Sequence, residues 1–291
     1  MNRFYCLIIC ILLIDIGSLS KGQENKETAT AYEFTAEENY KRLGSAETNE
    51  SPGPLITGVD AMKLFEYLIP GYKEDPNTRS QIRPYGVSYI LKKKINEGKK
   101  ALTTNYILGV LEDREKAIIE FGCEVGYVSG PVNPLSGLGD RAYYSSNPSN
   151  NWTTIRFRRK NVIVILEIDL PSEEVINIAK KMDYELEHNT TFITRGDKVI
   201  TPKFEIKNFP EIIELNKNVE CGIELKDIDP NDILIDSDSS AVIIQKGKEP
   251  KIIYHAPKIE REAGVKTFRI FIANKKNVIA KREYKINAVS D

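Results

Sequence analysis

The chain has 291 residues, and its 41% of hydrophobic residues is enough to build packed cores. Its 29% of charged residues nearly balance, to a net charge of −1, so there is no long-range field to draw the chain onto nucleic acid or an anionic membrane. Charges of both signs are typical of a solvated surface.

The start of the chain predicts a cleavable export signal over residues 1–20. Arg3 supplies the positive end, Tyr5–Ile14 is apolar, and Ser18–Ser20 offers small residues for a signal peptidase. This apolar run is shorter than the about 20 residues that span a bilayer, so no membrane span is expected after cleavage. The alternatives are a lipoprotein acylated at Cys10 and an uncleaved anchor. The expected location is secreted or periplasmic.

Residues 21–54 are predicted to form a flexible polar tether. Glu, Lys, Thr, Asn and Ser dominate this segment. Such a composition buries too little apolar surface to offset the entropy of ordering the chain. Thr35–Glu38 fits a capping box, so one short helix could form there.

Residues 55–190 are predicted to be an α+β domain with a mostly antiparallel sheet and packed helices. Apolar residues at helical spacing indicate helices at Ala61–Ile69, between Asp113 and Gly122, and after Pro171. The expected strands are 85–91, 105–111, 141–144, 153–158 and 162–168. The last of these is continuously apolar, as a strand covered on both faces would be.

The hairpin before this last strand carries a mixed pattern. Ile155 and Phe157 alternate with Arg156 and Arg158, so the apolar and basic side chains are expected on opposite faces. The turn Arg159–Asn161 follows, and its Asn is expected at the positive-φ position.

Residues 201–291 are predicted to form an immunoglobulin-like β-sandwich, because β-rich runs recur at roughly the 8–12-residue spacing of sandwich strands. The runs are 203–206, 212–215, 222–225, 241–245, 251–254, 266–273 and 278–286. Asn274–Asn277 is expected as a hairpin tip. Phe268 is expected on an edge strand open to docking. The single Trp, Trp152, lies outside this segment, so the likeness to antibody domains is architectural.

Two stretches resemble known sequences. Gly137–Ile168, read as GLGDRAYY and then TTIRFRRKNVIVILEI, resembles uncharacterised exported bacterial proteins in which a Gly-Asp-x-Ala-Tyr segment precedes an Arg-rich strand hairpin. The stretch from Ile252 to Ile286 is similar to bacterial immunoglobulin-like modules. The resemblance implies an envelope location and no particular reaction.

Sequence patterns that match enzyme motifs lie in the wrong structural context for those motifs. Gly137–Ala142 matches the letters of the dinucleotide fingerprint, but a Pro/Gly loop precedes it and a strand follows it. The two histidines, His188 and His255, fall in different predicted domains and share no metal-ligand spacing. They are interpreted as surface or cap residues. No cofactor and no metal site are predicted.

The loop Ser145–Trp152 and its flanks are the candidate ligand site. Aromatic faces beside Asn, Ser and Arg donors suit a glycan or an anionic polymer. The candidate residues are Tyr143, Tyr144, Trp152, Arg156, Arg158 and Arg159. The competing interpretation, which we favour, is a strand connection with its arginines facing solvent and Trp152 in the core.

Two further features leave alternatives open. Cys123 and Cys221 remain after signal cleavage, either as a disulfide between the domains or as two buried thiols. The acidic run either binds calcium or supplies ordinary turn residues. Its members are Asp227, Asp229, Asp232, Asp236 and Asp238.

The sequence therefore favours a non-enzymatic binding or adaptor protein of the cell envelope. The α+β domain would recognise a protein or polymer partner, and the sandwich would be a spacer or docking module. The alternatives are a structural envelope component, and an enzyme or enzyme accessory whose site is assembled from scattered carboxylates.

Overall fold

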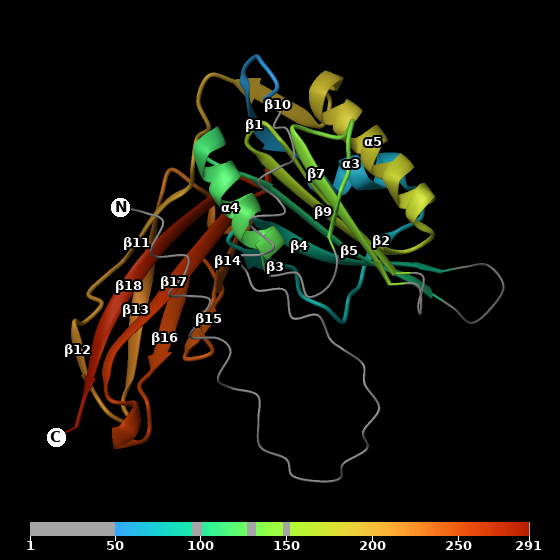
Figure 1. The fold of residues 1–291 in the computed structure, drawn as a ribbon. Coiled ribbons are helices and arrows are strands. Elements are labelled where there is room, and N and C mark those ends of the chain that lie inside the picture. The colour runs from blue at the N-terminus through green and yellow to red at the C-terminus, as the bar shows by residue number, and fades with distance from the viewer. Residues whose placement is uncertain (1–49, 95–100, 127–131, 148–151, 291) are drawn as a thin grey trace, which may run out of the picture.

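The computed structural model describes residues 50–94, 101–126, 132–147 and 152–290. The predicted export signal and nearly all of the predicted tether lie outside these residues. The described chain is a mixed α+β structure with mostly antiparallel sheets and three α-helices. Residues up to Gly196 form a helix-covered unit, and the residues after it form two further sheets (Figure 1).

The first unit is built on an eight-stranded antiparallel sheet in the order β2-β4-β5-β9-β8-β7-β6, with β3 paired beside β4. Its strands are β2 (Lys73–Glu74), β3 (Gln81–Arg83), β4 (Gly86–Lys94), β5 (Ala101–Val110), β6 (Asn133–Pro134), β7 (Arg141–Asn147), β8 (Trp152–Arg159) and β9 (Val162–Asp169). A separate antiparallel pair joins β1 (Leu55–Val59) to β10 (Ile193–Gly196). β10 lies past residue 190, the predicted end of the domain.

Helices cover both faces of the large sheet. α3 (Ala61–Leu68) and α5 (Ser172–His188) pack on one face, and α4 (Arg114–Gly126) packs on the other (Figure 1). Ile163 and Ile165 of β9 face α4, whereas Val164 and Leu166 join the α3–α5 core. The expectation of a strand covered on both faces is therefore confirmed.

The second predicted helix is longer than its sequence pattern indicated. Asp113 caps it as expected, since its Oδ1 accepts a hydrogen bond from Lys116 N at 2.7 Å. The helix continues past Gly122 to Gly126, because Val125 packs without exposed surface beside Phe121. Tertiary packing thus overrides the stop signal of a glycine.

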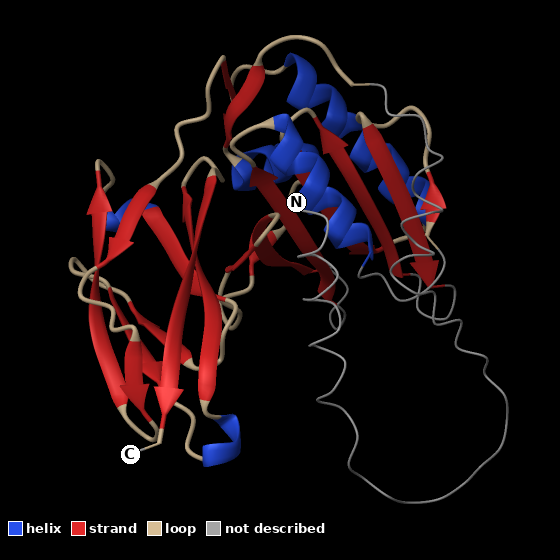
Figure 2. Cartoon of the chain, turned by 60° about the vertical axis from the view of Figure 1, so that its left-hand side comes forward, coloured by secondary structure: helices blue, strands red, loops and turns tan. Residues whose placement is uncertain are grey.

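The second unit consists of two four-stranded sheets, ordered β11-β13-β16-β15 and β12-β18-β17-β14 (Figure 2). Their strands are β11 (Lys203–Ile206), β12 (Ile212–Glu214), β13 (Asn218–Lys226), β14 (Ile233–Ser237), β15 (Val242–Gln245), β16 (Lys251–His255), β17 (Gly264–Asn274) and β18 (Ile279–Val289). Side chains from both sheets form one core, so the sheets make a sandwich. β14 is a strand that the sequence analysis did not anticipate.

The edges of this sandwich differ from expectation. Phe268 was expected on an edge, but β17 lies between β18 and β14, and the Phe268 side chain is buried. The difference arises because β17 is long enough to pair on both sides. It pairs with β14, which precedes it in the chain, and with β18, which follows it. The edge strands are β11, β15, β12 and β14.

A hairpin tip of the sandwich inserts into the first unit. The turn between β17 and β18 is the predicted one, and Lys276 O accepts a hydrogen bond from Val59 N, while Asn277 O accepts one from Val110 N, both at 2.9 Å. Val278 is buried within the core of the first unit. Gly58 allows this approach, because a Cβ there would lie 2.7 Å from Lys276 Cβ.

An apolar contact supports the same junction. Ile82 and Val87 of the first unit pack against Phe271, Ala273 and Ile279 of the sandwich. Because apolar burial and backbone hydrogen bonds act together here, the two units are joined by more than their linker.

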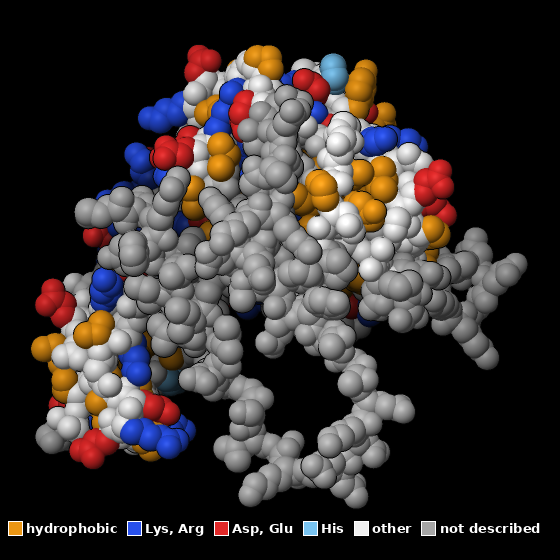
Figure 3. Space-filling model, in the orientation of Figure 1, with side chains coloured by type: hydrophobic (Ala, Val, Ile, Leu, Met, Phe, Trp, Pro, Cys, Tyr) orange, Lys and Arg blue, Asp and Glu red, His pale blue; other side chains and the backbone are white. Residues whose placement is uncertain are grey.

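Surface charge is mixed, as the composition predicted. Where side chains are coloured in Figure 3, basic and acidic ones lie among one another. Among the described residues, no helix combines the length and apolar character needed to cross a bilayer.

Candidate functional site

The structure separates the predicted ligand-site residues. Tyr143 and Tyr144 are successive in β7 and point to opposite faces: Tyr143 stacks on Phe121 of α4, whereas Tyr144 packs against the α3–α5 core. Trp152 begins β8 and is half-buried. Residues 148–151 of the predicted loop lie outside the described chain.

The arginines of β8 are buried rather than exposed. Arg156 is 7% and Arg158 is 1% exposed, so the expectation of a solvent-facing basic strand is wrong. Carboxylates explain this burial: Glu124 and Glu167 pair with Arg156, and Asp140 pairs with Arg158. Arg159, on the opposite face, pairs with Asp183 of α5. The arginines therefore hold the fold together, and no open site contains all six residues.

Asp140 is the centre of the tightest of these clusters. Its carboxylate accepts hydrogen bonds from Ser51 N at 3.0 Å, from Lys160 N at 2.6 Å and from Arg158 Nη1 at 3.3 Å. Glu50 also pairs with Arg158. Residues 50–54, which composition assigned to the tether, are thus held at their start by this cluster, with Ser51 buried. The Gly-Asp motif quoted above has a structural role.

Asn161 has a different role from the one expected. Lys160, and not Asn161, takes the positive φ of 54° in the turn. The buried Asn161 side chain instead joins the turn to β1 and to the residue after β5: its Oδ1 accepts from Ile56 N at 3.0 Å, and its Nδ2 donates to Ile56 O and Leu111 O, both at 2.8 Å. An asparagine has donors and an acceptor for this task, which explains its place in the Arg-x-x-Asn turn.

A line of polar side chains crosses the α4 face of the sheet. Ser88 donates to Asn105 at 2.8 Å, Asn105 donates to Glu167 at 2.7 Å, and Glu167 lies 3.8 Å from Arg156. Glu124 of α4 is 3.3 Å from Arg156 Nε and is buried. Desolvation by burial raises the pKa of Glu124, although Tyr85 and Arg156 oppose this shift.

Glu124 should make stability fall with pH. Its raised pKa means that the native state holds a proton that the unfolded state releases. The contribution of Glu124 to the free energy of unfolding is therefore complete below its unfolded-state pKa and is lost as pH rises through its native-state pKa. We expect Glu124→Gln, which stays neutral, to flatten this decline. Urea unfolding at several pH values checks it, with the exposed Glu115→Gln on the same helix as control. An unchanged slope in Glu124→Gln would contradict the assignment.

The other sequence candidates are dispersed. Cys123 lies on α4 and Cys221 on β13; both are described, and no disulfide joins them. Asp232 pairs with Lys275, and Asp238 with Arg269. In the part of the chain that the structure describes, no three His, Cys, Asp or Glu side chains gather as metal ligands would.

Of the two histidines, His188 lies at the surface as expected, whereas His255 is half-buried. His188 is exposed at the end of α5, where its ring stacks on Tyr184 at 4.2 Å between centroids. His255 Nδ1 lies 2.7 Å from Asn218 Oδ1 on the neighbouring strand β13. Each ring thus serves a local contact in its own unit.

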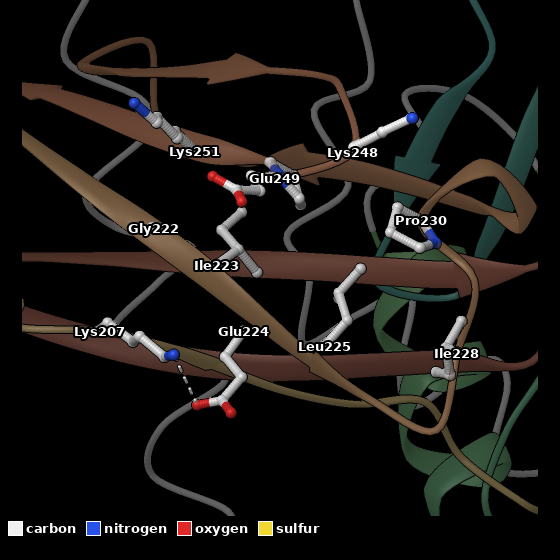
Figure 4. Close-up of a pocket in the computed structure, with 11 residues that line it drawn as sticks. Lys207, Gly222, Ile223, Glu224, Leu225, Ile228, Pro230, Lys248, Glu249 and Lys251 are labelled. Carbon is white, nitrogen blue, oxygen red and sulfur yellow. Dashed lines mark ion pairs between the residues drawn. The ribbon is translucent and has the colours of Figure 1, made fainter.

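Two hollows remain as candidate sites. One is an open groove of about 510 Å³ between α3 and α5, lined by Tyr67, Leu68, Lys180, Lys181, Tyr184 and Glu185. The other is a pocket of about 480 Å³ beside β13, with Leu225, Pro230, Lys248 and Glu249 in its wall (Figure 4). Both volumes fall within the range of about 300–1,000 Å³ that small-molecule sites occupy.

Sequence reasoning missed the groove. Tyr67 is 58% and Tyr184 is 61% exposed. The signal was present on α5, because Tyr184 falls outside the apolar stripe that the helix buries. Apart from its contact with His188, an aromatic residue off the buried stripe does not serve the core that the helix covers.

Comparisons with known proteins show only a coarse likeness. No protein-family model and no curated protein matches the chain. An endo-fucoidan hydrolase of glycoside hydrolase family 107 is 9% identical with a TM-score of 0.23, and the match covers 76% of this chain and 39% of that one. An I-band fragment of titin is 10% identical with a TM-score of 0.22, over 75% of this chain and 87% of that one. The similarity is to β-rich domains, with a weak immunoglobulin-like resemblance.

Proposed function

We propose that the chain is a secreted or periplasmic, non-enzymatic binding protein of the cell envelope, which recognises an anionic polymer in the groove between α3 and α5. The second unit is proposed to be an immunoglobulin-like spacer or docking module. The observation that supports a binding role is this groove, which combines exposed aromatic rings with exposed basic side chains.

The groove offers complementary chemistry to a charged sugar polymer. Tyr67 belongs to α3 and Tyr184 to α5, and both rings expose more than half of their surface. Sugar rings can stack on such faces. Lys180 and Lys181 are exposed and form no ion pair within the described residues, so their ammonium groups are available to carboxylate or sulfate groups.

Removing both rings should weaken polymer binding without unfolding the protein. We expect Tyr67→Ala/Tyr184→Ala to weaken binding at least about tenfold, as loss of exposed aromatic anchors does. The measurement is affinity capture from an envelope fraction, followed by titration with the captured polymer. Ile243→Ala/Val265→Ala removes exposed apolar side chains from the sandwich and serves as the matched control. Capture that is equal for both double variants would refute the groove.

A structural envelope role is the second candidate. Ile212 on edge strand β12 is 61% exposed, and Ile243 on edge strand β15 is 49% exposed. Apolar side chains on open edges favour pairing between copies of a chain. Recovery of the protein as its own ordered oligomer, without polymer, would favour this role.

A further inference from the structure

β13 changes its partner half-way along its length. Its residues 218–222 pair with β16, whereas residues 223–226 pair with β11 on the other side. Beyond residue 222, β16 is no longer beside β13. The second half of β13 therefore has a strand on only one side, although β13 is an interior strand of its sheet.

The backbone groups of this half-strand can be assigned to sides. Lys207 N donates to Gly222 O on the β11 side at 2.9 Å, and Ile223 N donates to Pro250 O on the opposite side at 2.8 Å. Successive residues of a strand direct their backbone groups to alternate sides. Leu225 therefore directs its N–H and C=O away from β11, into the space that β16 has left.

The 480 Å³ pocket occupies this space. Figure 4 shows Leu225, Ile228 and Pro230 at one end of the pocket, with Lys248 and Glu249 across from β13. Lys207 lies 3.5 Å from Glu224, and Lys251 lies 2.6 Å from Glu220, so both are already paired. Lys248 and Glu249 form no ion pair within the described residues, which leaves charges of both signs at the rim.

We propose that this gap binds an extended peptide segment of a partner protein as an added strand beside residues 224–226, next to the place where Pro250 already pairs with Ile223. Its backbone pairs with Leu225, one apolar side chain points inward beside Leu225 on the sandwich core, and the next points outward between Lys248 and Glu249. The proposal deepens the adaptor role, on which it rests for its biological meaning.

A peptide strand suits the gap better than a sugar does. The groups directed into the gap are the backbone N–H and C=O of Leu225, and the apolar wall continues into the core. None of the eleven lining residues is aromatic, so the stacking faces of the α3–α5 groove have no counterpart here.

Gly222 provides a variant that fills the gap. An added Cβ at Gly222 meets no atom within 4 Å, and Gly222 lines the pocket. A Phe side chain there is expected to occupy the ligand's space while leaving the strand intact, since Phe suits a strand better than Gly. Gly247 is equally unobstructed but does not line the pocket, so Gly247→Phe is the matched control.

The test uses the full-length protein and labelled eight-residue peptides that alternate Val, Ile or Phe with Thr, together with versions carrying a central Pro. We expect fluorescence anisotropy to show binding of the alternating peptides and not of the Pro versions. Gly222→Phe should weaken binding at least about tenfold, and Gly247→Phe should not. The Leu225 amide should become protected from hydrogen exchange when a peptide binds.

Two results would overturn the proposal: no alternating peptide binds more tightly than about 1 mM, or Gly222→Phe binds as well as the wild type while thermal melting shows that it is folded. A failure of the proposed polymer site can be distinguished from a failure of the proposed peptide site. Tyr67→Ala/Tyr184→Ala should retain peptide binding, and Gly222→Phe should retain polymer binding.

Discussion

Replacing Asp140 by alanine is expected to lower the free energy of unfolding by about 3–5 kcal/mol, because it leaves the nearly inaccessible guanidinium of Arg158 without its buried counter-charge. The change also removes the acceptor for Ser51 N and Lys160 N. Urea unfolding followed by circular dichroism measures the loss.

A second substitution separates charge from packing. Arg158→Met in the Asp140→Ala background removes a buried charge whose remaining carboxylate partner, Glu50, is exposed, and should recover part of the lost stability. Glu173→Ala, at an exposed position in the first turn of α5, is a control expected to stay within about 0.5 kcal/mol of the wild type. A loss below about 1 kcal/mol in Asp140→Ala would mean that Asp140 does not anchor the cluster.

Asn277→Ala should loosen the junction between the two units. Asn277 is 1% exposed at a φ of 60°, and its Nδ2 donates to Leu108 O at 3.2 Å and to Tyr89 Oη at 3.0 Å. Alanine loses these bonds and is strained at positive φ, which together cost about 2–5 kcal/mol. Differential scanning calorimetry should resolve two transitions where the wild type shows one.

Asn277→Gly separates the loss of hydrogen bonds from the backbone strain. Glycine tolerates the positive φ, so the remaining loss reports the side-chain hydrogen bonds. Lys275→Ala, in the same turn but exposed, tests the turn itself and should keep a single transition. If Asn277→Ala also unfolded in one unshifted step, the hairpin tip would not couple the units.

Local patterns were sufficient for the parts of the fold that bury a regular apolar face. The run Val162–Ile168 identified a strand covered on both sides, and the stripe from Val175 to Leu186 identified α5. These patterns show which face of one element is buried, and they can be recognised because the apolar side chains that form the pattern are close in sequence.

Contacts between distant segments could not be predicted in the same way. Asn161 forms hydrogen bonds with Ile56, 105 residues earlier, and the residues of the turn do not indicate which segment will be its partner. The arginines of β8 looked solvated because the carboxylates that pair with them come from other elements. Ser51 belongs to a polar segment, yet Asp140 holds it.

The candidate sites show the same division. Tyr184 could have been noticed as an aromatic off the helical stripe, but its groove also needs Tyr67 from a helix far away in sequence. The gap beside β13 depends on where β16 begins to pair. Gly222, a glycine inside a strand, was its only local sign.

The inserted hairpin also makes the connection between the two units rigid. β17 and β18 are continuous from the sandwich to the turn that is clamped between Val59 and Val110. A load applied to the sandwich is therefore carried as shear along two paired strands into the first core, and not across a hinge. If both proposed sites are occupied, the distance between them is set by the two joined units, so binding of one end of a bivalent partner would fix the effective concentration of its other end.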